Sequence, residues 1–145
     1  MEDTVLDIQK LLFAGVAGLM ILAAPAFGET MMFKADLKPG SEVPPAQSSG
    51  DGNAMVTLDT EKKSLSWKTT FSGLSGDATA AHFHGPAAPG ENAGPAVDIS
   101  GKIEEGSATV TDDQIKDLQA GKWYINIHTA KYPDGEIRGQ VEMAK

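Results

Sequence analysis

The chain has 145 residues, the length of one domain, and its 20 acidic residues against 12 Lys and Arg give a formal charge of −8. This acidic balance argues against a nucleic-acid binder, which needs clustered cations to displace counterions from the phosphate backbone. The absence of cysteine excludes disulfides, thiolate nucleophiles, zinc fingers and iron–sulfur clusters. Three histidines remain for metal or acid–base chemistry near neutral pH.

The N-terminal segment predicts an export signal. Residues 11–24 (LLFAGVAGLMILAA) carry no charge, and as a helix they reach about 21 Å, short of a hydrocarbon core of ~30 Å. Small-x-small patterns of the kind that signal peptidase accepts follow at residues 24–26 and 26–28. We expect a signal peptide over residues 1–28. Because acidic residues outnumber the single Lys10 ahead of the apolar run, the alternatives are an uncleaved membrane anchor or a misassigned start codon. With a signal peptide or an anchor, residues 29–145 are expected outside the cytoplasm, as a periplasmic or secreted domain.

The rest of the chain breaks into short alternating runs between Gly, Pro, Asp and Ser clusters, which is typical of an all-β sandwich or barrel. The predicted strands are Met31–Leu37, Ala54–Thr60, Ser64–Ser72, Thr79–His84, Ala96–Ser100, Ser107–Val110, Lys122–Thr129 and Glu136–Met143. One short helix is predicted within Thr111–Ala120, because its first four residues resemble a capping box and Gly121 follows it. The segment Gly85–Gly101 is either a lid over the histidines or a solvated crossover loop.

The last two strands can be aligned by their faces. Alternate residues are apolar along Trp123–His128, and Ile, Gly and Val alternate along Ile137–Val141. Burying both sets on one side fixes the parity of the pairing, because a slip of one residue turns a strand over. A three-residue loop, Pro133–Gly135, satisfies this parity and places His128 opposite Gln140, with Arg138 as its diagonal neighbour. A shift by two residues would keep the same faces.

The three histidines fall on the outward faces of two predicted strands. His82 and His84 flank Phe83, and residues i and i+2 of a strand point to one side. Phe83 is expected in the core, and His128 alternates with the apolar Ile127. A His-x-His pair can hold one metal ion, and a third His from a neighbouring strand completes a three-nitrogen site. A solvated or hydrogen-bonded role is the alternative, and the metal site requires the two strands to be adjacent.

Three imidazoles without a thiolate suit copper or zinc, and the divalent series favours Cu²⁺ over Zn²⁺. Because the ligand must be the neutral imidazole, the affinity should fall below about pH 6.5. Glu91, Asp98 and Glu136 are candidates for a fourth ligand or for a carboxylate that orients a ligand, although a solvated surface charge is the simpler interpretation of each. Asn126 lies on the histidine face and can orient a ligand, or it is an ordinary polar strand residue.

Several strings resemble the CHRD (chordin-type) domain family. They are AHFHGPA at residues 81–87, LQAGKWYINIHT at 118–129 and PDGEIRGQV at 133–141, with FKADLKPGSEVPP at 33–45 similar to the first strand and loop of the family. The resemblance covers about residues 31–143 and makes residues 29–145 a CHRD domain. It implies an immunoglobulin-like or Greek-key antiparallel β-sandwich, here with one short helix. The family occurs in animal chordin and as free-standing exported bacterial proteins, and membership does not settle a biochemical role.

The histidine arrangement also resembles copper-zinc superoxide dismutase, in which a strand-borne His-x-His and a later His hold copper. His82, His84 and His128 match those three roles, and Arg138 is similar in place to the arginine that guides the anionic substrate. The chain lacks the bridging histidine, the zinc-site histidines and the disulfide of that family. The resemblance therefore extends to the copper ligands alone, and a shared fold does not by itself imply the activity.

Two functions follow as hypotheses. The first is an exported domain that binds a single copper ion through His82, His84 and His128, for copper handling or superoxide-type redox chemistry with Arg138 as an anion guide. Its partner would be the metal ion, with no organic cofactor, no nucleic acid and no membrane contact beyond an uncleaved N-terminal segment. The second is a non-catalytic interaction or envelope-structural module without metal, which the acidic surface, the long loops and the absence of a complete catalytic set favour.

Overall fold

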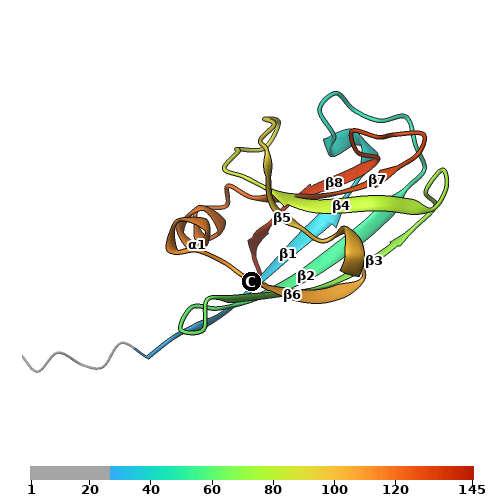
Figure 1. The fold of residues 1–145 in the computed structure, drawn as a ribbon. Coiled ribbons are helices and arrows are strands. Elements are labelled where there is room, and N and C mark those ends of the chain that lie inside the picture. The colour runs from blue at the N-terminus through green and yellow to red at the C-terminus, as the bar shows by residue number, and fades with distance from the viewer. Residues whose placement is uncertain (1–26) are drawn as a thin grey trace, which may run out of the picture.

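The computed structural model describes residues 27–145, which form two antiparallel β-sheets packed face to face (Figure 1). This architecture confirms the predicted all-β sandwich with one short helix. The predicted signal peptide or anchor over residues 1–28 lies outside the described residues, apart from its last two positions. Within residues 27–145, no helix is long and apolar enough to cross a membrane.

The five-stranded sheet has the strand order β6-β3-β2-β1-β9. Its members are β1 (Thr30–Leu37), β2 (Asp51–Asp59), β3 (Ser64–Ser72), β6 (Glu105–Thr109) and β9 (Glu142–Met143). Buried and exposed residues alternate along β1 and β2, because one face of this sheet packs on the core and the other meets solvent. Val56 pairs with Phe33 on one side and Trp67 on the other, and all three face the core.

The four-stranded sheet has the order β5-β4-β7-β8 and carries the histidines. Its members are β4 (Ala78–His84), β5 (Pro95–Asp98), β7 (Tyr124–Thr129) and β8 (Ile137–Gln140). Every residue of β7 is buried, on both faces of the strand. The inner face of β7 packs on the core, and connecting loops cover its outer face.

The core lies between the sheets and centres on aromatic side chains. The Phe83 ring is fully buried, with its centroid 5.8 Å from that of Trp67 and 5.9 Å from that of Trp123. Aromatic pairs at this spacing add to the free energy of burial. The prediction that Phe83 faces the core and leaves its two neighbouring histidines on the opposite face is confirmed.

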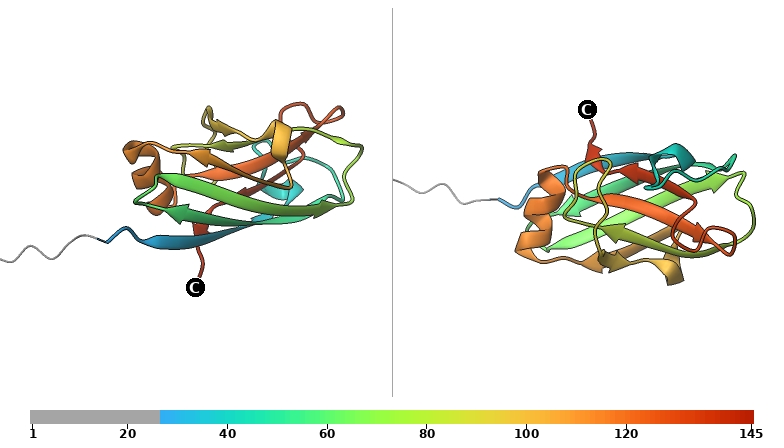
Figure 2. Two further views of the ribbon diagram at one scale, coloured as in Figure 1. Left: turned by 60° about the horizontal axis from the view of Figure 1, so that its bottom comes forward. Right: turned by 90° about the horizontal axis from the view of Figure 1, so that it is seen from above.

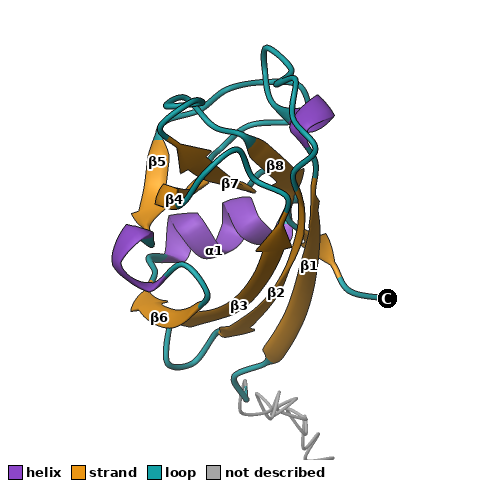
Figure 3. Cartoon of the chain, turned by 90° about the vertical axis from the view of Figure 1, so that its right-hand side faces the viewer, coloured by secondary structure: helices purple, strands orange, loops and turns teal. Residues whose placement is uncertain are grey.

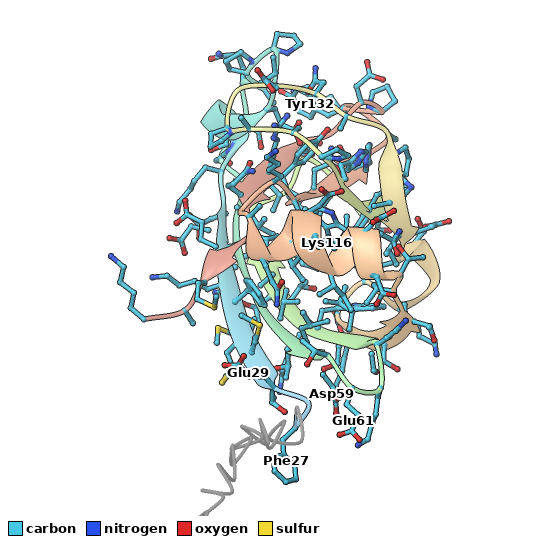
Figure 4. All side chains as sticks on the ribbon, turned by 90° about the vertical axis from the view of Figure 1, so that its left-hand side faces the viewer. Phe27, Glu29, Asp59, Glu61, Lys116 and Tyr132 are labelled. Carbon is cyan, nitrogen blue, oxygen red and sulfur yellow. The ribbon has the colours of Figure 1, made fainter. Side chains whose placement is uncertain are left out.

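Helix α1 (Asp112–Gln119) closes one end of the sandwich between the two sheets (Figures 2 and 3). The predicted capping box is present: Gln114 N donates to Thr111 Oγ1, and Thr111 N donates to Gln114 Oε1. Ile115 and Leu118 are buried against the core. Lys116 points outward from the helix (Figure 4). Two short 3-10 helices, Pro39–Ser41 and Ser100–Lys102, lie in the connections.

The C-terminal strand departs from the prediction of one continuous strand over Glu136–Met143. Strand β8 ends at Gln140, and β9 pairs with β1 in the other sheet. Val141, between the two strands, is fully buried in the core. The chain therefore changes sheets at this residue, and its last strand extends the edge of the five-stranded sheet.

The predicted pairing of His128 with Gln140 is wrong. Gln140 pairs with Tyr124, and Arg138 pairs with Asn126, so the register is shifted by four positions. The connection between β7 and β8 runs from residue 130 to residue 136 and is longer than the three-residue loop expected. Because the shift is even, each residue keeps its predicted face of the sheet.

Candidate metal centre

Strands β4 and β7 are direct neighbours, which brings the three histidines of the chain together. His82 pairs with Asn126, and Ala80 pairs with His128, one step further along the same face. The adjacency that the metal hypothesis required is therefore present. One ring nitrogen from each of His82, His84 and His128 lies within 4.8 Å of the others, so the three could hold a metal ion. Their ring centroids are 4.9 Å apart for His82 and His128, and 5.4 Å apart for His82 and His84.

The separation of the imidazole nitrogens fits a shared metal. His82 Nδ1 lies 3.1 Å from His128 Nε2. Bonds of about 2.0–2.1 Å from imidazole nitrogen to a copper-sized or zinc-sized ion place two ligands on one ion at about this distance from each other. The same separation also suits a hydrogen bond between the two rings when one of them carries the proton.

Backbone carbonyls orient two of the rings. His84 Nδ1 lies 2.9 Å from the carbonyl oxygen of Ala93, and His128 Nδ1 lies 2.8 Å from that of Pro133. Each Nδ1 therefore carries the proton and donates it, which leaves the lone pair of a neutral ring on Nε2. Both Nε2 atoms face the cluster. This is how protein metal sites fix the tautomer of a ligating histidine.

The third ring is oriented by a carboxylate. His82 Nε2 lies 3.7 Å from Asp98 Oδ1, on the neighbouring strand β5. Ser100 donates to the same oxygen from its hydroxyl and its backbone N–H, which lowers the pKa of Asp98 and fixes its side chain. With Nε2 directed at Asp98, His82 presents Nδ1 to the cluster. The sequence analysis named Asp98 as a candidate for a fourth ligand or an orienting carboxylate, and the structure places it beside His82.

Burial keeps two of the imidazoles neutral. Desolvation is the largest cause that lowers the pKa of His82, and the nearby His128 adds to it while Asp98 opposes it. Desolvation also lowers the pKa of His84, against the hydrogen bonds with Ala93 and Asn126. Both rings therefore favour the unprotonated form that binds metal at neutral pH. His84 and His128 are each 8% exposed, whereas His82 is the more exposed ring and opens the cluster to solvent.

Two residues of β7 that lie beside the histidines have larger parts in the site than the sequence indicated. Asn126 Oδ1 lies 2.9 Å from His84 Nε2 and 3.0 Å from His128 Nε2. The Tyr124 ring stacks on His84 with a centroid distance of 4.7 Å and an interplanar angle of 4°. Its hydroxyl bonds the backbone of Ala93, in the segment that covers His84. The alternation with apolar residues places Tyr124 on the histidine face, and that pattern was the signal for it.

The loop over residues 85–94 covers this face. Ala93 binds both His84 and Tyr124, and the loop ends where β5 begins at Pro95. The first part of the Gly85–Gly101 segment therefore covers the histidines, as the lid interpretation expected. Its second part forms the strand β5 and the start of the 3-10 helix Ser100–Lys102.

Arg138 lies on the same outer face, on β8, and β7 separates it from the His84 strand β4. Its guanidinium carbon is 3.5 Å from the centroid of the Tyr124 ring, so Tyr124 lies between His84 and Arg138. Arg138 is 2% exposed and donates to Asn92 Oδ1 at 2.8 Å and to the backbone oxygen of Glu91. The buried guanidinium holds the 85–94 loop against the sheet.

The other two predicted carboxylates have different surroundings. The Glu91 side chain is exposed and accepts a long hydrogen bond from Ala88 N. Glu136 is fully buried, and both of its oxygens accept hydrogen bonds, from Ser48 and Ser75 on one side and from Ser75 and Thr129 on the other. Through these hydrogen bonds the Glu136 carboxylate joins the segments that contain Ser48, Ser75 and Thr129, and both of its oxygens are already in use.

Glu42 is a buried acidic residue that the sequence did not indicate. It is 5% exposed, and desolvation raises its pKa to about 7, against the opposing effects of Arg138 and the Asn126 amide. A Cβ atom at Gly135 would overlap both Glu42 Oε1 and Asn126 Nδ2, so these two polar atoms lie together against this glycine. Glu42 belongs to a loop, and its burial depends on a hairpin almost a hundred residues later, which no local pattern reveals.

Comparison with known proteins gives one match. A family model described as CHRD domain matches residues 33–141, which is most of the chain and includes every residue of the histidine cluster. Neither the curated proteins nor the solved structures include a significant match.

Proposed function

The chain belongs to the CHRD domain family, and we propose that it binds one copper ion through His82, His84 and His128 outside the cytoplasm. The role of this site would be copper handling or superoxide-type redox chemistry. One observation carries the proposal: each histidine directs one ring nitrogen to an oxygen atom of the protein and the other toward the common centre. An arrangement that serves only hydrogen bonding has no need of three such rings.

The chemistry of the donor set favours copper. Imidazole nitrogen suits copper and zinc, and for a given set of such ligands the affinity for Cu²⁺ exceeds that for Zn²⁺. Export, which the N-terminal sequence suggests, would expose the site to either metal. When bound, copper can accept and release one electron. The protein's own part is to hold three imidazoles in fixed orientations, to fill the outer face with Tyr124 and to cover it with the 85–94 loop.

Calorimetric titration with Cu²⁺ tests the proposal. Wild-type protein should bind one equivalent, and His82→Ala and His128→Ala should each lose at least tenfold in affinity, because each removes one of three nitrogen donors. Lys116→Ala, on the outward face of α1 (Figure 4), is the control and should bind as wild type does. Equal affinity in wild type and both histidine variants would refute the site, and so would no binding at all.

A superoxide-quenching assay on the loaded protein separates the two roles. Quenching well above that of the same copper concentration in buffer supports redox chemistry. Quenching no better than free copper supports copper handling. Should copper not bind, capture of a partner that is insensitive to chelator would support the non-catalytic interaction module instead.

A further inference from the structure

We infer that Asn126 supplies a fourth ligand to the metal through its side-chain oxygen, so that the protein itself completes the coordination shell. This inference rests on the proposed copper site and adds its fourth donor. Asn126 Oδ1 lies 2.9 Å from His84 Nε2 and 3.0 Å from His128 Nε2, and His128 Nε2 in turn lies 3.1 Å from His82 Nδ1. The four donor atoms, from the three histidines and from Asn126 on the same face of the sheet, are therefore separated by the distances expected between neighbouring ligands of one ion.

Hydrogen bonding alone does not account for this cluster. His84 and His128 use their Nδ1 protons on the carbonyls of Ala93 and Pro133, so each Nε2 of the neutral ring presents a lone pair. Asn126 Oδ1 is also an acceptor, and it faces both lone pairs at about 3 Å. Acceptors at this distance repel one another unless a proton or a cation lies between them. A bound cation satisfies every acceptor together.

The surroundings of Asn126 hold its amide in this orientation. Its Nδ2 donates to the backbone oxygen of Asp134 at 3.4 Å and lies with Glu42 Oε1 against Gly135. Turning the amide over would direct Oδ1 at that carbonyl, which is also an acceptor. The Asp134 carbonyl therefore keeps the amide nitrogen on the far side and the amide oxygen toward the histidines.

A fourth protein ligand changes what the site can do. Sites with a complete set of protein ligands hold their metal, whereas catalytic sites keep one position open for water or substrate. An amide oxygen is also a harder donor than nitrogen and favours Cu²⁺ over Cu⁺. The Asn126 ligand thus makes the site one that holds oxidised copper, and reduction of the ion would weaken its binding. Copper handling, rather than turnover at an open position, follows from it.

The test compares Asn126→Asp with Asn126→Leu in the full chain, loaded with Cu²⁺ alone. Asp keeps an oxygen donor at the same place, and Leu has a similar volume without one. We expect Asn126→Asp to bind copper within a few-fold of wild type, and Asn126→Leu to bind on the order of 10–100-fold more weakly. Electron paramagnetic resonance should give the same imidazole contribution in all three. Added azide should change the spectrum of Asn126→Leu, whose position is open, and leave that of wild type unchanged.

The outcomes distinguish the inference from the proposal beneath it. Copper binding by wild type with equal affinity and equal azide response in Asn126→Leu would overturn the fourth ligand and leave the three-histidine site intact. The same holds if Asn126→Asp loses binding as severely as Asn126→Leu while both remain folded by circular dichroism, since an amide hydrogen would then be the essential feature. No binding by wild type overturns both. If Asn126→Leu does not fold, the azide response of wild type and the affinity of Asn126→Asp still decide.

Discussion

At the scale of single residues, the outer face of the four-stranded sheet depends on polar side chains that the protein buries and satisfies. Each histidine has an oxygen partner, Arg138 has the Tyr124 ring and the 85–94 loop, and Glu136 has three hydroxyl donors and one backbone donor. Burying such groups without partners would cost the protein several kcal/mol each. The residue types on this face could be predicted from the alternation of each strand, but their partners could not. Some partners are backbone carbonyls in irregular turns, such as those of Ala93 and Pro133, and others come from loops distant in sequence, such as Ser48 and Asn92.

The buried carboxyl group of Glu136 should make the stability of the protein depend on pH. Burial alone would raise its pKa, but the hydrogen bonds from Ser48, Thr129 and Ser75 outweigh it and lower the pKa to about 2. A carboxyl group with a depressed pKa in the folded state stabilises the protein fully above its unfolded pKa, and that contribution is lost as the pH falls from about 4.5 through about 2. Glu136→Gln should therefore lower the free energy of unfolding by ~2–3 kcal/mol at pH 7.

Urea denaturation from pH 7 down to pH 2.5 checks this sign. The difference between wild type and Glu136→Gln should shrink steadily below about pH 4.5. Glu61→Gln, an exposed carboxylate at the opposite end of the molecule from Tyr132 (Figure 4), is the control and should stay close to wild type throughout. A difference for Glu136→Gln that is independent of pH would show that the carboxylate charge is not what stabilises this junction.

At the scale of secondary-structure elements, the strands and the helix follow their local patterns, and their pairing follows tertiary contacts. The capping box of Thr111 and Gln114 fixes the start of α1 and needs no partner elsewhere, so its prediction succeeded. The predicted register of β7 with β8 failed because the turn between them is held from outside the hairpin: Ser48 and Ser75 bond Glu136, and Glu42 lies against Gly135. The predicted inward and outward faces of both strands were correct, since they depend only on which residues are apolar.

The junction of β4 with the covering loop gives a prediction at this scale. A Cβ atom at Gly85 would lie 2.3 Å from Trp123 Cδ1 and 2.7 Å from the backbone oxygen of Lys122, which leaves no room for a side chain. Gly85→Ala should therefore force β4 and the segment before β7 apart beside His84. We expect a loss of ~1–3 kcal/mol in unfolding free energy, as for other overpacked interiors, together with weaker copper binding.

Gly94→Ala is the matched control, because a Cβ atom there meets nothing within 4 Å and the glycine lies in the same loop. It should change neither thermal stability nor copper affinity by more than the error of the measurement. If Gly85→Ala also left both quantities unchanged, the close approach of Gly85 to Trp123 would not be what sets the position of His84.

At the scale of the whole molecule, one sheet has an exposed outer face and the other has a covered one. The loops over residues 39–46, 85–94 and 130–136 gather at the four-stranded sheet, where Glu42, Ala93 and Pro133 contact the histidine face or the residues beside it. This covering turns an ordinary polar strand face into a partly enclosed cluster of nitrogen and oxygen donors. The sequence placed three histidines on outward faces, and the enclosure became visible only with the fold.

Pulsed electron paramagnetic resonance on protein loaded with one equivalent of Cu²⁺ tests most directly the proposal that three imidazoles of this domain hold one copper ion. The nuclear modulation counts the imidazoles that bind the ion. We predict one spectral species with three imidazole ligands in wild type and two in His84→Ala. A spectrum of aqueous or heterogeneous copper in wild type, or the same imidazole count in both proteins, would contradict the account.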